Sequence, residues 1–145
     1  MKYTTEVVID LQRQKVIELF DSPENLYKWQ EGLKKYEAIS GEPGQEGSFS
    51  KMVYAARKGD LEMTELITRR NFPDEFHSTY RARGVHNEMY NYFEEQGNRT
   101  LWRTVSIFKF KGLMAILAPF MKTAFTHNTL LNMERFKHFA ENQIT

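Results

Sequence analysis

The histidines of this sequence are not arranged for metal binding. His77, His86, His127 and His138 form no HExxH or HxxxH pair. His127 and His138 share a face of an expected C-terminal helix, but their eleven-residue separation spans about 16 Å, too far for one metal ion. His77 and His86 fall in the charged phase of their expected strands, so we expect both to be exposed. With no cysteine, P-loop, GxGxxG or GxSxG motif, we expect no metal and no cofactor.

One carboxylate is a candidate for acid–base chemistry. In the expected strand 60–70, Glu62 and Glu65 lie in opposite phases, and both phases also carry apolar residues. One of the two is therefore expected to point inward, where burial would raise its pKa and suit it to general acid–base catalysis. If Glu65 is the inward one, it is the candidate catalytic residue. The alternative is structural: a hydrated carboxylate at a sheet edge or cavity mouth, or one paired with an arginine.

The charge-free phases of four other expected strands mix aromatic rings and thioethers with hydroxyls and amides. Isolated charges are rarely buried, so these phases should face inward. Ligand cavities are mostly apolar with a few placed polar groups, although a core with hydrogen-bonded Ser, Thr and Asn has the same composition. With two tryptophans and two side chains of the C-terminal helix, they form the candidate ligand cavity: Trp29, Met52, Tyr54, Tyr80, Asn87, Met89, Asn91, Trp102, Ser106, Phe108, Met121 and Phe125.

Polar members of this set would orient a bound molecule by hydrogen bonds. They are Tyr54, Asn87, Asn91 and Ser106. The tryptophans have two interpretations, because Trp29 and Trp102 would serve equally as pocket walls or as ordinary core residues.

The elements that must position these residues follow from periodicity and turn chemistry. Residues 2–10 alternate as a half-buried strand, and short helices are expected over 13–20 and from Pro23 to about Gly32, the second capped by Ser22. Short turns rich in Gly, Asn, Asp and Pro then separate the strands of an antiparallel meander. The expected strands are 34–41, 48–56, 60–70, 75–83, 86–95 and 99–109.

A long amphipathic helix is expected over residues 113–141. Pro119 should break it into a short helix and a main helix, because proline removes a hydrogen bond and clashes with the preceding turn. The apolar stripe consists of Met114, Ala118, Met121, Phe125, Met133, Phe136 and Ala140.

The segment 113–121 is apolar on all sides, so a single buried face does not account for it. Three interpretations are open. The segment is a fully buried helix start, a contact between two copies of a homodimer, or a lid at the cavity mouth that also contacts membranes. It is far shorter than the roughly 20 residues of a membrane span, so we expect no stable membrane insertion.

Composition limits the classes of partner and compartment. The chain has 145 residues, which suits a single domain over 1–145. Its net charge of +1 lacks the basic footprint of nucleic-acid binding, so we expect no nucleic-acid partner. The first residues contain no apolar signal-peptide core, and together with the absence of cysteine this makes the cytoplasm the expected compartment. The aromatic content of 14% indicates a large core or a lined pocket.

Strand, two short helices, six-stranded meander and long helix form an order that resembles the helix-grip fold. Three stretches add to the likeness: FDSPENL at 20–26, YFEEQGNRTLW at 92–102 and MERFKHFAE at 133–141. They resemble segments of bacterial members of the START-like superfamily, also called SRPBCC or birch-pollen-allergen-like. The resemblance covers nearly the whole chain and implies an α+β fold. In this fold a seven-stranded antiparallel sheet wraps around a long C-terminal helix, with two short helices between the first two strands.

The resemblance also implies a cavity between sheet and helix. Members bind lipids, sterols, polyketides or plant hormones, some cyclise polyketides, and some act only as protein partners. The simplest relatives carry labels such as polyketide cyclase/dehydrase and lipid transport. We therefore expect binding or carriage of a small hydrophobic ligand. The alternatives are a protein-interaction module with a filled core and a cyclase- or dehydratase-type enzyme, and the absence of a catalytic constellation weighs against the enzyme.

Overall fold

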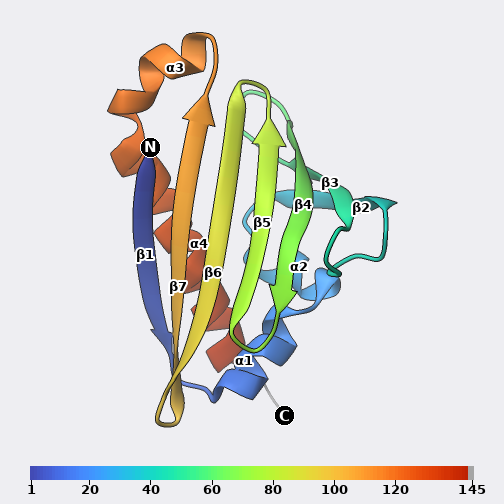
Figure 1. Ribbon diagram of the computed structural model, residues 1–145, viewed down its shortest axis with the longest axis vertical. Helices are drawn as coiled ribbons and strands as arrows, with labels where there is room; N and C mark the ends of the chain where they lie inside the picture. Colours follow the sequence, from blue (N-terminus) through green and yellow to red (C-terminus); the bar gives the residue numbers. More distant parts are fainter. Residues whose placement is uncertain (144–145) are drawn as a thin grey trace.

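One antiparallel sheet of seven strands dominates the computed structural model, which describes residues 1–143 (Figure 1). The strand order is β1-β7-β6-β5-β4-β3-β2, so the first strand pairs with the last and the others form a meander. Every neighbouring pair is antiparallel. The strands are β1 (Lys2–Ile9), β2 (Leu33–Ser40), β3 (Phe49–Tyr54), β4 (Leu61–Asn71), β5 (Glu75–Ala82), β6 (Val85–Gln96) and β7 (Arg99–Phe110).

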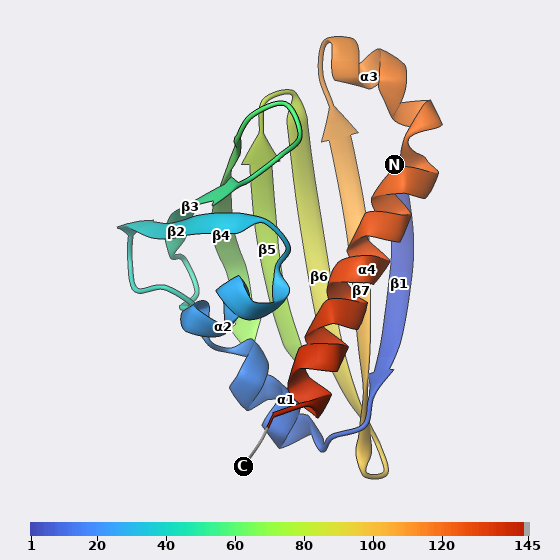
Figure 2. The same cartoon turned by 180° about the vertical axis from the view of Figure 1, so that it is seen from behind.

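The helices α1, α2 and α4 cover one face of this sheet. Two of them, α1 (Arg13–Phe20) and α2 (Pro23–Trp29), connect β1 to β2. The long helix α4 (Lys122–Glu141) runs obliquely across the same face and packs against β1 and α2 (Figure 2). This arrangement confirms the expected α+β helix-grip architecture, with element bounds close to those that the periodicity predicts.

Local chemistry explains where the short elements begin and end. The Ser22 hydroxyl accepts a hydrogen bond from the Asn25 N–H at 3.2 Å, and Pro23 occupies the first turn of α2. Gly32 then turns the chain into β2 with a φ of +76°. A Cβ atom there would lie 3.0 Å from the carbonyl oxygen of Ala55, so both the backbone conformation and the close approach require glycine.

Pro119 interrupts the C-terminal helical region as predicted. The short helix α3 (Leu113–Leu117) ends before it, and a 3-10 turn, η1, spans Ala118–Phe120. The main helix α4 begins at Lys122. The break separates α4, which crosses the sheet, from α3, which lies beyond the end of β7 (Figure 2).

An aromatic cluster forms the core at one end of the space between sheet and α4. The Phe20 ring lies 5.1 to 6.3 Å, centroid to centroid, from six other aromatic rings. These belong to Trp29, Phe72, Phe76, Phe93, Trp102 and Phe136. The C-terminal half of α4 supplies Met133, Phe136 and Ala140 to the same cluster. Large rings therefore fill this end, and the N-terminal half of α4 faces a different environment.

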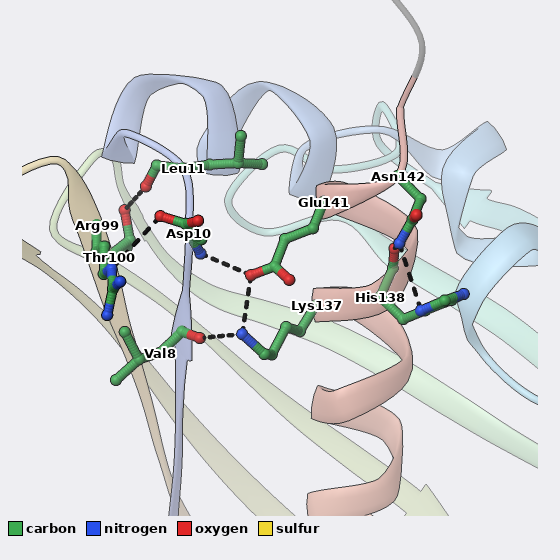
Figure 3. A network of polar contacts seen from close by, with 9 residues as sticks. All are labelled: Val8, Asp10, Leu11, Arg99, Thr100, Lys137, His138, Glu141 and Asn142. Atoms are coloured by element: carbon green, nitrogen blue, oxygen red, sulfur yellow. Dashed lines mark hydrogen bonds and ion pairs between the residues drawn. The ribbon is translucent and has the colours of Figure 1, made fainter.

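Polar contacts hold the C-terminal end of α4 against β1 and the loop after it (Figure 3). The Lys137 ammonium donates to the Val8 carbonyl oxygen at 2.6 Å, and the Glu141 carboxylate accepts from the Asp10 N–H at 2.7 Å. Lys137 and Glu141 also form an ion pair at 2.8 Å. These contacts fix the register of α4 on the sheet and so set the position of its N-terminal half.

The predicted exposure of His77 is wrong. This side chain lies on the outer face of the sheet but is only 6% exposed. Its ring lies 5.0 Å from that of Tyr90 and 5.1 Å from that of Tyr92, and its Nε2 lies 2.9 Å from the Glu75 carboxylate. Charge phase identifies the outer face correctly, but two tyrosines of the neighbouring strand β6 cover the histidine there.

The interpretation of 113–121 as a fully buried helix start is also wrong. Only Ala118 is buried, because α3 extends past the end of the sheet. Four large apolar side chains are between 42% and 84% exposed: Leu113, Ile116, Leu117 and Phe120. Among residues 1–143, no helix has both the length and the apolar character that crossing a membrane requires.

Candidate ligand cavity and its buried carboxylate

A cavity of about 1000 Å³ lies between the sheet and the N-terminal half of α4. Met121, at the N-cap of α4, and Phe125 of α4 form one wall, and the inward side chains of β3 to β7 form the other. The lining reaches the β3–β4 loop, the β5–β6 turn and Met114 of α3, where Ala56, Arg83 and their neighbours are exposed. The cavity is therefore open toward the end of the sheet near α3, and exposed lining residues also lie after α2 and on α4, at Glu31, Leu131 and Arg135.

The structure places ten of the twelve predicted cavity residues in this lining. They are Trp29, Tyr54, Tyr80, Asn87, Met89, Asn91, Trp102, Phe108, Met121 and Phe125. Met52 and Ser106 point into the interior and are buried, but they do not line the cavity. A role in ligand binding stays a prediction for every residue of the set.

Both tryptophans belong to the aromatic core and also to the cavity wall. The Asn91 side-chain oxygen accepts from Trp102 Nε1 at 2.9 Å and from Thr104 Oγ1 at 2.8 Å. Because this oxygen already accepts two hydrogen bonds within the protein, it fixes the positions of Trp102 and Thr104 in the cavity wall. Asn87 differs, since its side-chain oxygen is buried, lies in the lining and has no hydrogen-bond partner among the described residues.

Glu65 is the carboxylate that points into the cavity. It is 6% exposed and lies between the inward residues Met63 and Ile67 of β4. Tyr36 on β2 donates to its Oε1 at 2.7 Å, and Tyr80 on β5 donates to its Oε2 at 2.7 Å. Two strands of the sheet therefore each contribute a hydroxyl to one buried carboxyl group.

Glu62 occupies the opposite phase and projects from the outer side of the strand. Its side chain is 65% exposed and lies 3.3 Å from the Lys51 ammonium. The alternation of the strand therefore assigns the two carboxylates to different surroundings: Glu62 is an exposed, ion-paired residue at the edge of the cavity, and Glu65 is buried in its wall.

Burial controls the ionisation of the polar cluster formed by Glu65, Tyr36, Tyr54 and Tyr80. Removal from water raises the pKa of Glu65, although the hydrogen bonds from Tyr80 and Tyr36 partly oppose the shift. Burial, reinforced by the nearby Glu65 charge, also raises the pKa values of Tyr36, Tyr54 and Tyr80. The three phenols therefore stay protonated, and they surround a carboxyl group that resists ionisation.

Two members of the cluster were missed by sequence analysis. Tyr36 lies on a strand whose two phases both carry charge, through Lys34 and Lys35, so no inward face could be assigned to it. Gln30 follows α2, and its side-chain oxygen accepts a short hydrogen bond from the Tyr54 hydroxyl. Only the packing of α2 and β2 against the sheet brings Gln30 and Tyr36 to the site.

The described residues contain no group of three or more His, Asp and Glu side chains placed to hold a metal ion. Among the charged residues of the described lining, Glu65 is the one that is buried. The others are half-buried or exposed: Asp21, Glu31, Asp60, Glu62, Arg81, Arg83 and Arg135.

Comparison with solved structures identifies the architecture. Ara h 8.0201 superposes with a TM-score of 0.76 at 10% sequence identity, covering 99% of both chains. A conserved protein from Geobacillus kaustophilus gives 0.79 at 11% identity over 97% of this chain and 95% of its own. The chain has the START-like, helix-grip fold. Truncated norcoclaurine synthase from Thalictrum flavum shares this fold at a TM-score of 0.73 and 10% identity, covering 99% and 95% of the two chains.

No protein-family model matches the helix-grip chain, and no curated protein matches it. At sequence identities of 10% and 11%, the likeness to these structures shows a shared fold alone.

Proposed function

We propose that this helix-grip protein binds or carries a small, mostly apolar molecule in the cavity between sheet and α4. The observation that carries the proposal is the cavity itself, about 1000 Å³ in volume, with many aromatic and methionine side chains in its lining and one buried carboxyl group, Glu65, among the polar ones. That volume is at the upper end of the roughly 300–1000 Å³ range of small-molecule sites. Burial of apolar ligand surface would supply most of the affinity.

The cavity argues against a protein-interaction module with a filled core, because packed interiors leave few voids larger than a water molecule. The exposed apolar side chains of α3 and η1 are compatible with a homodimer or membrane contact beside the open end. Such a contact would be an additional role of this surface and would not replace ligand binding in the cavity.

The first experiment is native mass spectrometry of the freshly purified protein, followed by extraction and identification of any bound molecule. A stoichiometric adduct that is lost on denaturation supports the proposal. Met121→Asp and Phe125→Asp place a charge in the α4 wall and should abolish retention in a folded protein. Thr123→Asp on the exposed side of α4 is the matched control and should retain the ligand. Retention by folded Met121→Asp and Phe125→Asp would show that α4 does not line the site.

A specific observation favours a second function, proton-transfer catalysis of the cyclase or dehydratase kind. Glu65 is a buried carboxyl group with a raised pKa at the cavity wall, as a general acid–base requires. The test is to incubate the protein with its extracted ligand or analogues and follow loss of water or rearrangement by mass spectrometry. Turnover that disappears in Glu65→Gln supports catalysis. Turnover that is unchanged in this variant excludes Glu65 as the catalytic residue.

A further inference from the structure

The buried Glu65 carboxylate has no cationic partner within the described chain. It takes part in none of the ion pairs formed by residues 1–143. Its polar contacts are the hydroxyls of Tyr36 and Tyr80. A buried carboxyl group is ordinarily paired with a cation, bound to a metal or kept protonated, because an uncompensated charge costs several kcal/mol or more. A carboxylate that lines a cavity without such a partner leaves that role open to the occupant.

The phenol donors that line the cavity around Glu65 are already committed. Tyr36 and Tyr80 each give their single hydroxyl proton to Glu65, and Tyr54 gives its proton to Gln30. A carboxylate offers about four lone-pair sites and each phenol oxygen can also accept, so accepting capacity remains. The cluster therefore presents acceptors to the cavity, and its favoured partner is a group with several donors.

The cluster also has the composition of a site for an organic cation. Tyr36, Tyr54 and Tyr80 come from three strands, and all three line the cavity together with Glu65. Tyrosine rings attract cations through their π faces, most strongly where water is excluded. One carboxyl group and three phenols thus bring acceptor oxygens and aromatic rings together in the cavity wall.

We propose that the molecule bound in this cavity carries a protonated amine, and that its ammonium group contacts Glu65 and the oxygens of Tyr36, Tyr54 and Tyr80. The inference rests on the proposed function and names its ligand class, an apolar body with one ammonium group. The apolar body would occupy the methionine- and phenylalanine-lined part of the cavity, toward Met121 and Phe125.

Other head groups fit less well. A carboxylate head would bring a second negative charge and no donor to the cluster of Glu65 and its phenols. The arginines of the lining, Arg81, Arg83 and Arg135, are exposed and form no ion pair with Glu65. An alcohol would supply one donor and no positive charge, so Glu65 would stay in the protonated form that burial favours and would gain no counter-ion. A primary ammonium supplies three donors and the missing positive charge together.

The experiment compares three probes that share one alkyl chain: decylamine, decanol and decanoate. Binding of each probe to the full chain is measured by isothermal titration calorimetry at neutral pH, where the amine is protonated. Probe concentrations stay below those at which micelles form. Decylamine should bind at least about tenfold more tightly than either other probe, as expected for a hydrogen bond to a charged group. Glu65→Gln, which keeps the shape and an acceptor oxygen, should remove this preference for decylamine over decanol.

Glu88→Gln is the matched control. Glu88 also accepts a hydrogen bond from a tyrosine, Tyr90, but it lies outside the cavity lining. This variant should keep the full preference for decylamine. Because the probe ranking is measured on the wild-type protein, it decides the inference even if Glu65→Gln fails to fold.

The outcomes separate the two proposals. If decanol or decanoate binds as tightly as decylamine, apolar binding stands and the ammonium inference is overturned. The same holds if folded Glu65→Gln keeps the amine preference. If none of the three probes binds, the proposed function and the inference fail together.

Discussion

Tyr80 and Glu65 are direct cross-strand neighbours on β5 and β4, and the Tyr80 hydroxyl donates to Glu65 Oε2 at 2.7 Å. Directly opposed residues of an antiparallel pair project from the same face, so strand register alone places the phenol over the carboxylate. Tyr36 reaches the other carboxylate oxygen from β2, two strands from β4. The sheet must curve for this contact, and the polar cluster therefore forms where the curved sheet encloses the cavity.

The pH dependence of unfolding should report the burial of Glu65. Burial raises the folded-state pKa of Glu65. At pH values below the usual glutamate pKa both states are protonated, and the group costs nothing. As pH rises further, the Glu65 carboxyl group ionises in the unfolded chain but stays protonated in the folded protein. The stability of wild type relative to Glu65→Gln should therefore fall from about pH 4 upward and level off above the raised pKa. Urea unfolding across this range measures the difference.

Glu141 should show the opposite slope in the same experiment. Burial raises the pKa of Glu141, but hydrogen bonds from Lys137 and the Asp10 N–H outweigh this effect, and the net pKa is lowered. Its stabilising contribution is present above the unfolded pKa and is lost as pH falls through the folded value. The stability of wild type relative to Glu141→Gln should thus increase with pH. Parallel slopes for the two variants would contradict the assigned environments.

Tyr80→Phe should destabilise the fold. The substitution keeps the ring and leaves one oxygen of a buried carboxyl group without its donor, at a cost of about 1–3 kcal/mol in the free energy of unfolding. The pKa of Glu65 should rise further, because the Tyr80 hydrogen bond lowers this pKa in the wild-type protein and the variant lacks that bond. Urea unfolding and carbon-13 titration of the Glu65 carboxyl group measure the two effects. Tyr90→Phe, which removes a hydroxyl from the outer face, is the control and should change stability by about 0.5 kcal/mol or less.

Arg70 should be a larger contributor to stability than the surface cations. Its guanidinium donates to the Asp21 carboxylate and to the Gly44 carbonyl oxygen, each at 2.7 Å, and joins the end of α1 to β4 and to the β2–β3 loop. Arg70→Met should cost about 1–3 kcal/mol, since it leaves a half-buried carboxylate without its partner.

The control for Arg70 is the exposed pair of Lys34 and Asp60, whose side chains are 53% and 47% exposed. Lys34→Met should cost about 0.5 kcal/mol or less, because water and salt screen such a pair. Equal losses for Arg70→Met and Lys34→Met in chemical denaturation would count against the bridging role of Arg70.

Two phenylalanines of the C-terminal region should respond differently to the same truncation. Phe136 is fully buried, and its ring lies 5.2 Å from that of Trp29 and 5.4 Å from that of Trp102. Phe136→Ala should lose about 3–5 kcal/mol. Phe120 is 84% exposed, and Phe120→Ala should change stability by about 0.5 kcal/mol or less. A large loss of thermal stability in Phe120→Ala would show that η1 packs against the domain in solution.

Short-range rules account for most of the secondary structure. Alternation identifies the buried face of β1, where Tyr3, Thr5, Val7 and Ile9 are all buried. Pro119 ends one helix, and Ser22 with Pro23 begins another, as the sequence predicts. Each of these features depends on residues within one turn or one strand, so the sequence determines them without knowledge of distant partners.

Alternation has a limit at β4, because it places Glu62 and Glu65 on opposite faces without saying which face is the interior. The pairing of β4 with β3 and β5, and the helix α4 across one face, make that choice. Tyr36 and Gln30 join Glu65 for the same reason, since elements far apart in the chain meet there.

The sequence by itself determined the order of elements, the break at Pro119 and the composition of the inward faces. Tertiary structure decided that the space beside α4 is a cavity, that His77 is covered by Tyr90 and Tyr92, and that Phe120 is exposed. The physical reason is that period and turn chemistry act over a few residues. Burial and cavity volume instead depend on how closely separate elements approach, which is set by the packing of side chains distant in the sequence.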